Sequence, residues 1–203
     1  MGRAAGAEPA VSQLRVRARP EITVDGQRLI DTGNLATAVN SRFLGGELAG
    51  VSGPFSIQSE FQQVWVSQGP GQGAGKVGLS FRGAYAMATY SLTGEPRRYD
   101  ARTGVFTRFR PHADFDPRQG TWGAWEIAAR ISALDLNDHA DLPATGGIAG
   151  GYQTNYSAGL NWYWSSFFRL QANYIRADVR RGTGSQSQGT KADIIGLRVH
   201  QEW

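Results

Sequence analysis

The last thirteen residues alternate between apolar and charged positions. Odd positions are mainly apolar and even positions mainly charged: Ile195, Leu197, Val199 and Trp203 against Arg198, His200 and Glu202. A period of two is the spacing at which a strand turns successive side chains to opposite faces. The pattern is typical of the strand that closes an outer-membrane β-barrel, with its apolar side chains toward lipid. An amphipathic edge strand of a soluble β-sandwich would show the same alternation, so this strand alone leaves both folds open.

Residues 151–164 show the clearest alternation in the chain. Even positions carry the aromatic and apolar side chains of Tyr152, Tyr156, Leu160, Trp162 and Trp164, and odd positions carry the polar ones of Gln153, Asn155, Ser157 and Asn161. Lipid outside and water inside require such a strand. Residues 168–178 repeat the pattern, with Arg169, Gln171 and Asn173 inward. A three-residue loop, 165–167, would keep Trp164 and Phe168 on one face.

Three further segments follow the same rule. Residues 121–136 place Glu126 and Arg130 on the polar face, residues 55–62 alternate after a Gly53-Pro54 turn, and 42–50 alternate more weakly. Residues 78–92 are ambiguous, because Arg82 favours the even face inward whereas the even-numbered alanines suit lipid. A bulge would reconcile the two. These segments predict about eight antiparallel strands.

The connections are of two kinds. Residues 24–40, 68–76, 137–150 and 180–190 are longer, polar and Gly-rich, as extracellular loops tend to be, whereas 52–54 and 165–167 are short turns. If the short turns are periplasmic, the strand directions make 93–120 a periplasmic connection. We interpret residues 1–12 as a disordered or non-native start, because no apolar stretch of a secretory signal follows it. An exported protein would then need a longer precursor.

Composition narrows the class. The 203 residues include 27 Gly and 6 Trp but no Cys. The mean hydropathy of -0.38 does not argue against a membrane location, since lipid-facing and lumen-facing residues average out within each strand. No stretch of about 18 apolar residues exists, which excludes a transmembrane helix.

The basic residues are almost all arginine. The net charge is +4, and only Lys76 and Lys191 of the 21 basic residues are lysines. Arginine keeps its charge at any relevant pH and presents a planar fork of donors that matches oxyanions. A GC-rich genome would also favour arginine codons, so composition alone does not establish anion binding.

Arginines recur at every second position in residues 13–22. In a strand, Arg15, Arg17 and Arg19 would lie on one face, about 6.6 Å apart. Such a ladder could pass an anion from one guanidinium to the next, and several moderate sites in series let the ion leave again. A solvated basic face that binds acidic lipid or nucleic acid is the alternative. Pro20 is a mild objection to a strand.

Signals for catalysis or metal binding are poor. His112, His139 and His200 lie far apart and lack metal-ligand spacing. The run at 71–76 lacks residues that a phosphate-binding loop requires. We expect Glu47, Glu60 and Glu126 to pair with inward arginines rather than to act as acids or bases. The sequence therefore predicts no enzyme, no cofactor and no metal site.

Six stretches resemble the C-terminal half of the phosphate-selective porins of the O and P type. They are Arg15–Glu21 (RVRARPE), Gly53–Phe61 (GPFSIQSEF), Leu92–Glu95 (LTGE), Gly123–Asn137 (GAWEIAARISALDLN), Gly159–Trp164 (GLNWYW) and the final strand. The resemblance extends over residues 13–203. It implies a sixteen-stranded, trimeric barrel in the Gram-negative outer membrane, and it favours the arginine ladder over the solvated basic face.

We therefore expect an all-β chain whose residues 13–203 form half of a porin barrel. The expected function is passive uptake of phosphate or polyphosphate past Arg15, Arg17, Arg19, Arg130, Arg169 and Arg198. Inorganic anions, outer-membrane lipid and two further copies of the chain are the expected partners, and nucleic acid is not. A closed eight-stranded barrel with an anchoring role and no pore is the alternative, and a soluble β-sandwich is a third reading.

Overall fold

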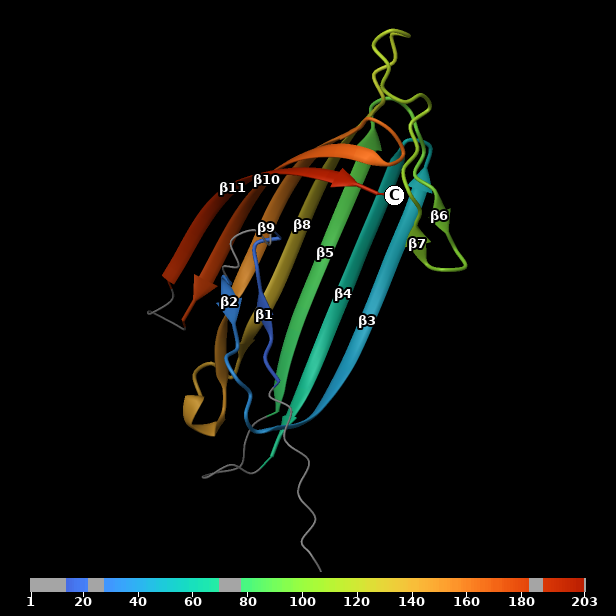
Figure 1. Ribbon diagram of the computed structural model, residues 1–203. Coiled ribbons are helices and arrows are strands. Elements are labelled where there is room, and N and C mark those ends of the chain that lie inside the picture. Colours follow the sequence, from blue (N-terminus) through green and yellow to red (C-terminus); the bar gives the residue numbers. More distant parts are fainter. Residues whose placement is uncertain (1–13, 22–27, 70–77, 183–187, 203) are drawn as a thin grey trace, which may run out of the picture.

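Seven long antiparallel strands form one curved sheet (Figure 1). The computed structural model describes residues 14–21, 28–69, 78–182 and 188–202. The sheet comprises β3 (Ala38–Ser52), β4 (Phe55–Gln68), β5 (Leu79–Ser91), β8 (Ala124–Asp138), β9 (Ile148–Tyr163), β10 (Phe168–Arg181) and β11 (Gln188–Gln201). Its order is β11-β10-β9-β8-β5-β4-β3, so strands that follow one another along the sheet pair, and β3 and β11 form its edges. The predicted start, 1–12, and Trp203 lie outside the described residues.

The predicted alternation sets the facing of each strand. Leu160 of β9 pairs with Ala172 of β10, which in turn pairs with Leu197 of β11, and all three lie on the convex face. The neighbouring row joins Asn161 to Gln171 and Arg198 on the concave face. Because the side-chain period of a strand is two, one register keeps every apolar row together and every polar row together. The facing predicted for 55–62, 121–136, 151–164, 168–178 and the final strand is confirmed.

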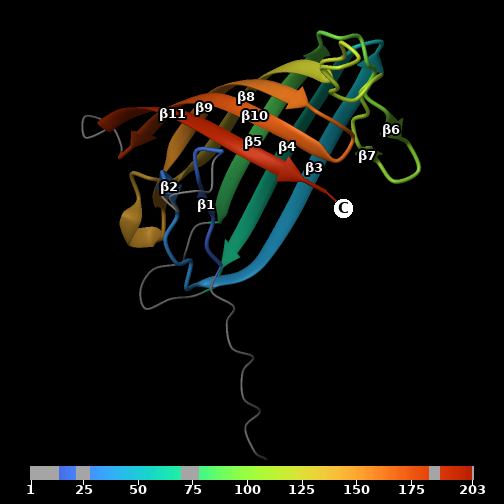
Figure 2. The ribbon, with the colours of Figure 1, turned by 45° about the horizontal axis from the view of Figure 1, so that its top comes forward.

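The arginine segment does not join the large sheet. Within residues 14–21 only β1 (Arg17–Ala18) is a strand, and it pairs with β2 (Ile30–Asp31). Figures 1 and 2 show this pair on the concave side of the sheet, in front of β8 and β9. The sheet therefore has seven described strands where about eight were expected. Pro20, which lacks a backbone donor, lies two residues after the short paired stretch and fits its early end.

The two ends of the sheet differ as the loop lengths predicted. At one end, Gly53 has a φ of 55° in a two-residue turn that joins β3 to β4. At the same end, the backbone N–H of Trp164 donates to the carbonyl of Phe168 at 3.0 Å, which closes the predicted three-residue loop 165–167. Residues 92–123 also connect strands at this end and contain a small hairpin of β6 (Tyr99–Asp100) and β7 (Val105–Phe106). The loop between β8 and β9, with a 3₁₀ turn at Pro143–Thr145, lies at the opposite end.

Strand β5 resolves the ambiguity of residues 78–92. Its pairings with β4 and β8 show no register shift, so the suggested bulge is not present in this strand. Arg82 lies on the convex face together with the even-numbered alanines, and its guanidinium approaches Asp135 at 3.7 Å. Arg82 stands at the loop end of the strand, where the apolar row has ended, so its charge remains in a polar environment.

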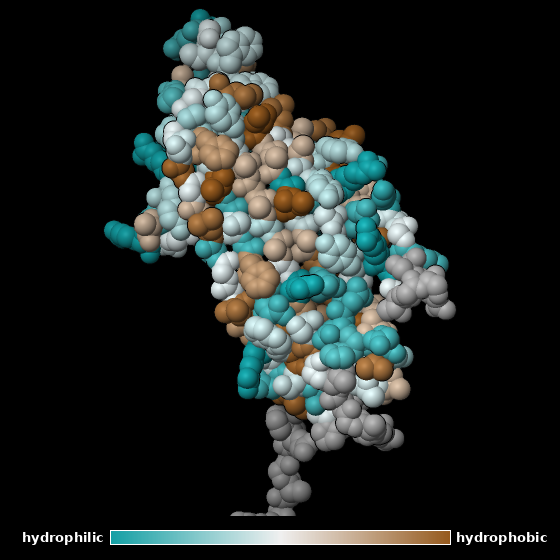
Figure 3. All heavy atoms as spheres, turned by 180° about the vertical axis from the view of Figure 1, so that it is seen from behind, coloured by the Kyte–Doolittle hydropathy of each residue, from teal (hydrophilic) through white to brown (hydrophobic). Residues whose placement is uncertain are grey.

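The convex face carries an apolar band. Its large exposed side chains include Phe55, Ile57, Phe61, Tyr90, Ile127, Ile131, Tyr156, Leu160, Tyr174, Ile195, Leu197 and Val199. In Figure 3, which views the molecule from behind, brown and tan side chains gather in the upper and middle part and teal ones are more frequent below. Toward the loops the band ends at the charged residues Arg82, Asp135, Arg176 and Asp193. A band of limited height is what a bilayer requires.

Aromatic rings gather at the short-turn end of this band. Trp125 and Trp162 stack with their centroids 5.0 Å apart, and Trp162 also contacts Trp164 at 5.3 Å. Trp164 in turn lies 5.2 Å from Phe168 across the three-residue loop. Such a cluster beside a short turn resembles the aromatic girdle that flanks the apolar band of an outer-membrane barrel. Among the described residues there is no helix with the length and apolar character needed to cross a membrane.

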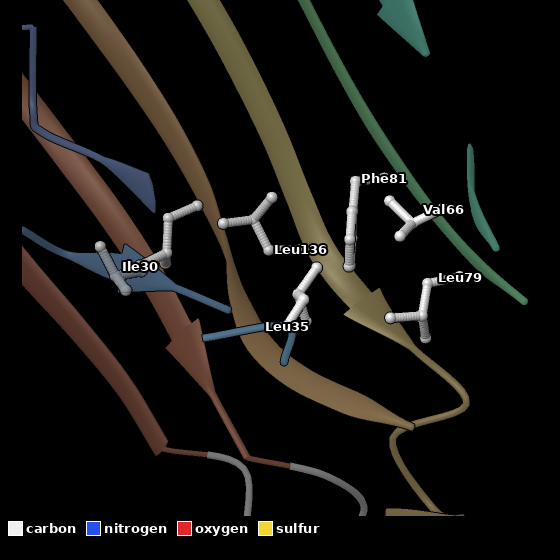
Figure 4. Packing of buried hydrophobic residues seen from close by; sticks show 7 residues of the cluster. Ile30, Leu35, Val66, Leu79, Phe81 and Leu136 are labelled. Carbon is white, nitrogen blue, oxygen red and sulfur yellow. The ribbon is translucent and has the colours of Figure 1, made fainter. Parts of the chain in front are cut away.

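An apolar cluster fastens residues 14–18 and 29–35 to the concave face. Figure 4 shows how Ile30 and Leu35 meet Leu136, Phe81, Leu79 and Val66 of the sheet, all at most 3% exposed. Leu14, Val16 and Ala18 pack against the same cluster. Burial of this apolar surface is the main force that holds the segment inside the curve of the sheet.

Candidate functional site

The concave face of β8 to β11 is polar and partly covered. Gln153, Asn155 and Asn161 of β9 are at most 7% exposed, although amides are rarely buried in a sheet. They are hydrogen-bonded, for example from Gln153 Nε2 to Asn155 Oδ1 at 2.9 Å and from Gln171 Nε2 to Asn161 Oδ1 at 2.8 Å. This face thus offers ordered polar groups to whatever occupies the concavity.

The arginine segment keeps its period of two although it is not a barrel strand. Residues 14–18 run antiparallel to 29–35, with hydrogen bonds from Leu29 N to Ala18 O at 3.0 Å and from Thr32 N to Val16 O at 2.9 Å. The even-numbered side chains pack on the apolar cluster, which leaves Arg15 and Arg17 exposed. Arg19 is half-buried, and its carbonyl accepts a hydrogen bond from Gln153 Nε2 at 3.2 Å.

Arg15 is fixed by a carboxylate of the neighbouring strand. Its Nε lies 2.8 Å from Asp31 Oδ1, and its Nη2 also bonds Asp31 Oδ2. The hydrogen bond from Arg15 lowers the pKa of Asp31 to about 2. Asp31 additionally accepts from Gly33 N at 2.8 Å. The pair holds the guanidinium in place beside β2 but leaves it 46% exposed.

Arg28 adds a fourth guanidinium to this group. The pKa of Arg28 is lowered, mainly by burial and further by the positive charges of Arg17 and Arg19. Arg28 lies two residues before β2, the partner strand of β1, so it stands beside the arginine segment. Sequence reasoning missed Arg28, because it lies in a stretch interpreted as a polar loop; its place directly before the apolar pair Leu29-Ile30 was the available signal.

Arg130 and Arg198 line the same hollow on the concave face. The guanidinium carbon of Arg130 lies 3.8 Å from the centroid of the Tyr85 ring, a cation–π contact that fixes its plane. Its Nε donates to Glu21 Oε1 at 2.9 Å. Arg198 lines a hollow of about 270 Å³ together with Glu21 and Arg130. Arg19 and Arg130 line a second cavity of about 260 Å³.

Arg169 belongs to the short-turn end instead. It lies 5.8 Å from the Tyr163 ring and lines a cavity of about 390 Å³ with Arg97, Arg108 and His200. The structure thus divides the six predicted arginines. Arg15, Arg17 and Arg19 lie on the arginine segment. Arg130 and Arg198 line the hollow on the concave face, and Arg169 lies nearer the turns.

Residues 92–112 fold over that end of the sheet. Arg97 forms a bidentate pair with Glu126 of β8, with both N···O distances 2.7 Å, and Glu126 is 0% exposed. Burial opposes the charge of Arg97, but the hydrogen bond to Glu126 prevails and raises the pKa of the guanidinium. Phe109 stacks on Tyr163 at 4.2 Å beside this pair. The expected pairing of Glu126 is confirmed, with a partner from the connection rather than from a strand.

Glu95 anchors the start of the same connection. Burial would raise the pKa of this carboxyl group, but hydrogen bonds from Ser91 and Thr93 and from the backbone of His112 outweigh it, so the pKa is lowered. The expected partner of Glu60 was an arginine, and instead Glu60 accepts a hydrogen bond from Gln62. In the part of the chain that the structure describes, no three His, Cys, Asp or Glu side chains come together as metal ligands do.

Known proteins resemble this chain over most of its length. The family model of the phosphate-selective porin O and P matches residues 4–201. An uncharacterized protein of Caulobacter vibrioides is 32% identical over 193 residues, which cover 93% of this chain and 35% of that protein. Porin O of Pseudomonas aeruginosa is 28% identical over 142 residues, which cover 68% of this chain and 30% of that protein. The chain spans about a third of the length of these relatives.

Fold, arginine-bearing concave face and comparisons agree. A sheet with an apolar convex face, a polar concave face and an arginine-rich segment folded against it is the arrangement expected of a pore wall. The family model covers nearly all of that sheet and the segment. The chain belongs to the phosphate-selective porin O and P family.

Proposed function

We propose that this chain is part of an outer-membrane porin that takes up phosphate or polyphosphate passively. The observation that carries the proposal is the row of Arg15, Arg17 and Arg19 on the concave side of a sheet whose convex face is apolar. Guanidinium groups bind oxyanions through paired donors, and several sites of moderate strength let an anion enter and leave. Arg130, Arg169 and Arg198 extend the basic surface across the inner wall.

We further propose that the sheet is the C-terminal half of a sixteen-stranded barrel, which assembles as a homotrimer. The sheet edges β3 and β11 support the first part, because hydrocarbon does not tolerate unpaired backbone groups and further strands must therefore cover them. Residues 92–123 then lie on the periplasmic side, together with the short turns. The trimer rests on the family resemblance, and the pore needs no catalytic group or cofactor.

Planar-bilayer recordings of the intact protein test the selectivity. We expect phosphate to block the chloride current, and we expect the triple variant R15A/R17A/R19A to need at least about tenfold more phosphate for half-block, since each pairing with a guanidinium is a charge-assisted hydrogen bond. The matched control is R82A/R176A/R180A, which removes three arginines from the convex face. Equal phosphate block in the wild type and the first variant, or equal loss in both variants, would refute the ladder.

A second candidate is a small closed barrel that anchors or supports the envelope without a pore. The apolar cluster between residues 14–18 and 29–35 and the sheet favours it, because it fills part of the concavity. Barrels of about eight strands leave an interior that side chains fill. In that case the isolated chain would show heat-modifiable migration in detergent, and neither it nor the intact protein would conduct chloride.

A further inference from the structure

Glu21, at the end of the arginine segment, reaches to the concave face of the sheet. Its Oε1 accepts hydrogen bonds from Arg130 Nε at 2.9 Å and from the Ser132 hydroxyl at 2.5 Å. Its Oε2 accepts from the Ser157 hydroxyl at 2.5 Å. All three donors belong to β8 and β9, at least 109 residues away in the sequence.

The three donors form a prepared site. Arg130 is oriented by the Tyr85 ring, with 3.8 Å between its guanidinium carbon and the ring centroid. Asn155 Nδ2 donates to the Ser132 hydroxyl oxygen at 3.2 Å, which directs the hydroxyl hydrogen toward Glu21. A guanidinium and two hydroxyls that converge on two oxygens of one anion are the donors that bind a carboxylate or a phosphate.

The backbone of Glu21 is strained to make this contact. Its φ is 59°, in the left-handed region that residues with a β-carbon rarely adopt. Such strain persists where surrounding contacts hold it, and it gathers at functional sites. The strain indicates that the contacts of its carboxylate, rather than the conformational preference of the local backbone, fix Glu21 in this position.

Open space lies on both sides of the occupied site. The cavity of about 260 Å³ is lined by Glu21, Arg130 and Arg19, whose Nε is buried without a hydrogen-bond partner among the described residues. The hollow of about 270 Å³ is lined by Glu21, Arg130 and Arg198. An anion that moves between Arg19 and Arg198 therefore passes the donors that Glu21 occupies.

We propose that Arg130, Ser132 and Ser157 form an oxyanion site and that Glu21 is its built-in competitor. The tethered carboxylate takes the place of a permeating oxyanion such as phosphate, and it lowers the affinity of the site so that the anion leaves again. This inference rests on the proposed function, because it requires oxyanions to enter the concavity. It adds one negatively charged residue to the proposed anion path, whose other named residues are arginines.

The variant Glu21→Gln tests the competition in the intact protein. The probe is inorganic phosphate, and the measurement is the concentration that halves the chloride current in planar bilayers. We expect E21Q to lower that concentration about tenfold, because the donors lose a charged competitor. Adding R130Q to E21Q should abolish the gain. Glu21→Gly, which suits the left-handed backbone, repeats the test if E21Q does not fold.

The matched control is Glu60→Gln. Glu60 lines the same 260 Å³ cavity but accepts its hydrogen bond from Gln62 rather than from Arg130. If the competitor model holds, E60Q changes half-block much less than E21Q. Equal shifts in the two variants would show that loss of any negative charge in the lumen has the same effect, and would overturn the proposal. An E21Q variant with the same half-block concentration as the wild type would overturn it as well. A wild-type protein that phosphate does not block would instead refute the proposed function.

Discussion

At the scale of single residues, burial separates two ion pairs of the same chemistry. The side chains of Arg97 and Glu126 are 20% and 1% exposed, whereas Arg108 and Glu202 are each 37% exposed. Loss of Arg97 leaves the carboxylate of Glu126 buried without its counter-ion. Loss of Arg108 leaves the carboxylate of Glu202 in contact with water. The first pair therefore fixes residues 92–112 to the sheet far more strongly than the second.

We expect Arg97→Met to lower the free energy of unfolding by about 3 kcal/mol, because Glu126 stays buried without its cation. Arg108→Met is the matched control and should cost less than about 1 kcal/mol, the range of exposed pairs. Guanidinium unfolding of the intact protein in detergent micelles measures both. Equal costs would contradict the role of burial.

Asp31 gives a pH-dependent prediction at the same scale. Its pKa is lowered from 3.8 to about 2 by Arg15, so the pair stabilises the folded segment above about pH 4. That contribution is lost as the pH falls through about 2, where the folded carboxylate takes up its proton. We expect the variant Arg15→Ala to return the pKa of Asp31 toward 3.8. A carbon-13 NMR titration of the carboxyl group measures this shift, and an unchanged pKa would show that Arg15 is not its cause.

At the scale of elements, the alternation of side chains decides what each strand contacts. Leu197 on the convex face is 84% exposed, whereas its neighbour Arg198 lines the hollow beside Glu21. One residue along a strand thus separates lipid from lumen in the proposed barrel. The same rule placed Arg82 outside, which its charge alone did not predict.

Single cysteines can test this facing, because these 203 residues contain no native cysteine and any cysteine elsewhere in the intact protein can be replaced by serine. We expect Arg198→Cys in the intact, membrane-embedded protein to react with a water-soluble methanethiosulfonate. Leu197→Cys should stay unreactive, since hydrocarbon excludes the charged reagent. Mass spectrometry of the labelled protein gives the extent of reaction. Comparable labelling of both cysteines would show that the convex face of β11 is not in lipid.

At the scale of the whole molecule, the edges of the sheet determine what the chain can be. Both β3 and β11 have one neighbour each among the described strands. If further strands of the intact protein cover them, half of the backbone amides of β11 bond outside this chain. If β3 instead closed on β11, the isolated chain would form a small barrel by itself.

Amide hydrogen exchange separates these two architectures. In the isolated 203-residue chain in micelles, we expect every second amide of β11, the set that points away from β10, to exchange fast. In the intact protein the same amides should be protected. NMR-detected exchange provides the residue-level rates. Protection of the whole of β11 in the isolated chain would favour the closed barrel over the porin half.

Sequence reasoning was strongest where the signal is local. The strands around Trp162, Leu170 and Ile127 and the three-residue loop 165–167 follow from alternation alone. It was weakest for β5, because small alanines give little contrast between the two faces and one charged residue, Arg82, at the strand end weighed too heavily. The arginine segment has the predicted period of two, but this period does not indicate that β1 pairs with β2 rather than with a strand of the large sheet.

The sequence by itself determined most of the long strands, their facing where the alternation is strong, and the basic character of the inner side, because each of these is encoded in residues two positions apart. Only the tertiary structure decided that the arginine segment lies against the concave face, that Arg97 reaches Glu126, and that Glu21 occupies the donors of Arg130 and Ser157. Glu21 and Arg130 are 109 positions apart in the chain. Contacts over such distances arise from burial of apolar surface and curvature of the sheet, which leave no periodic trace in the sequence.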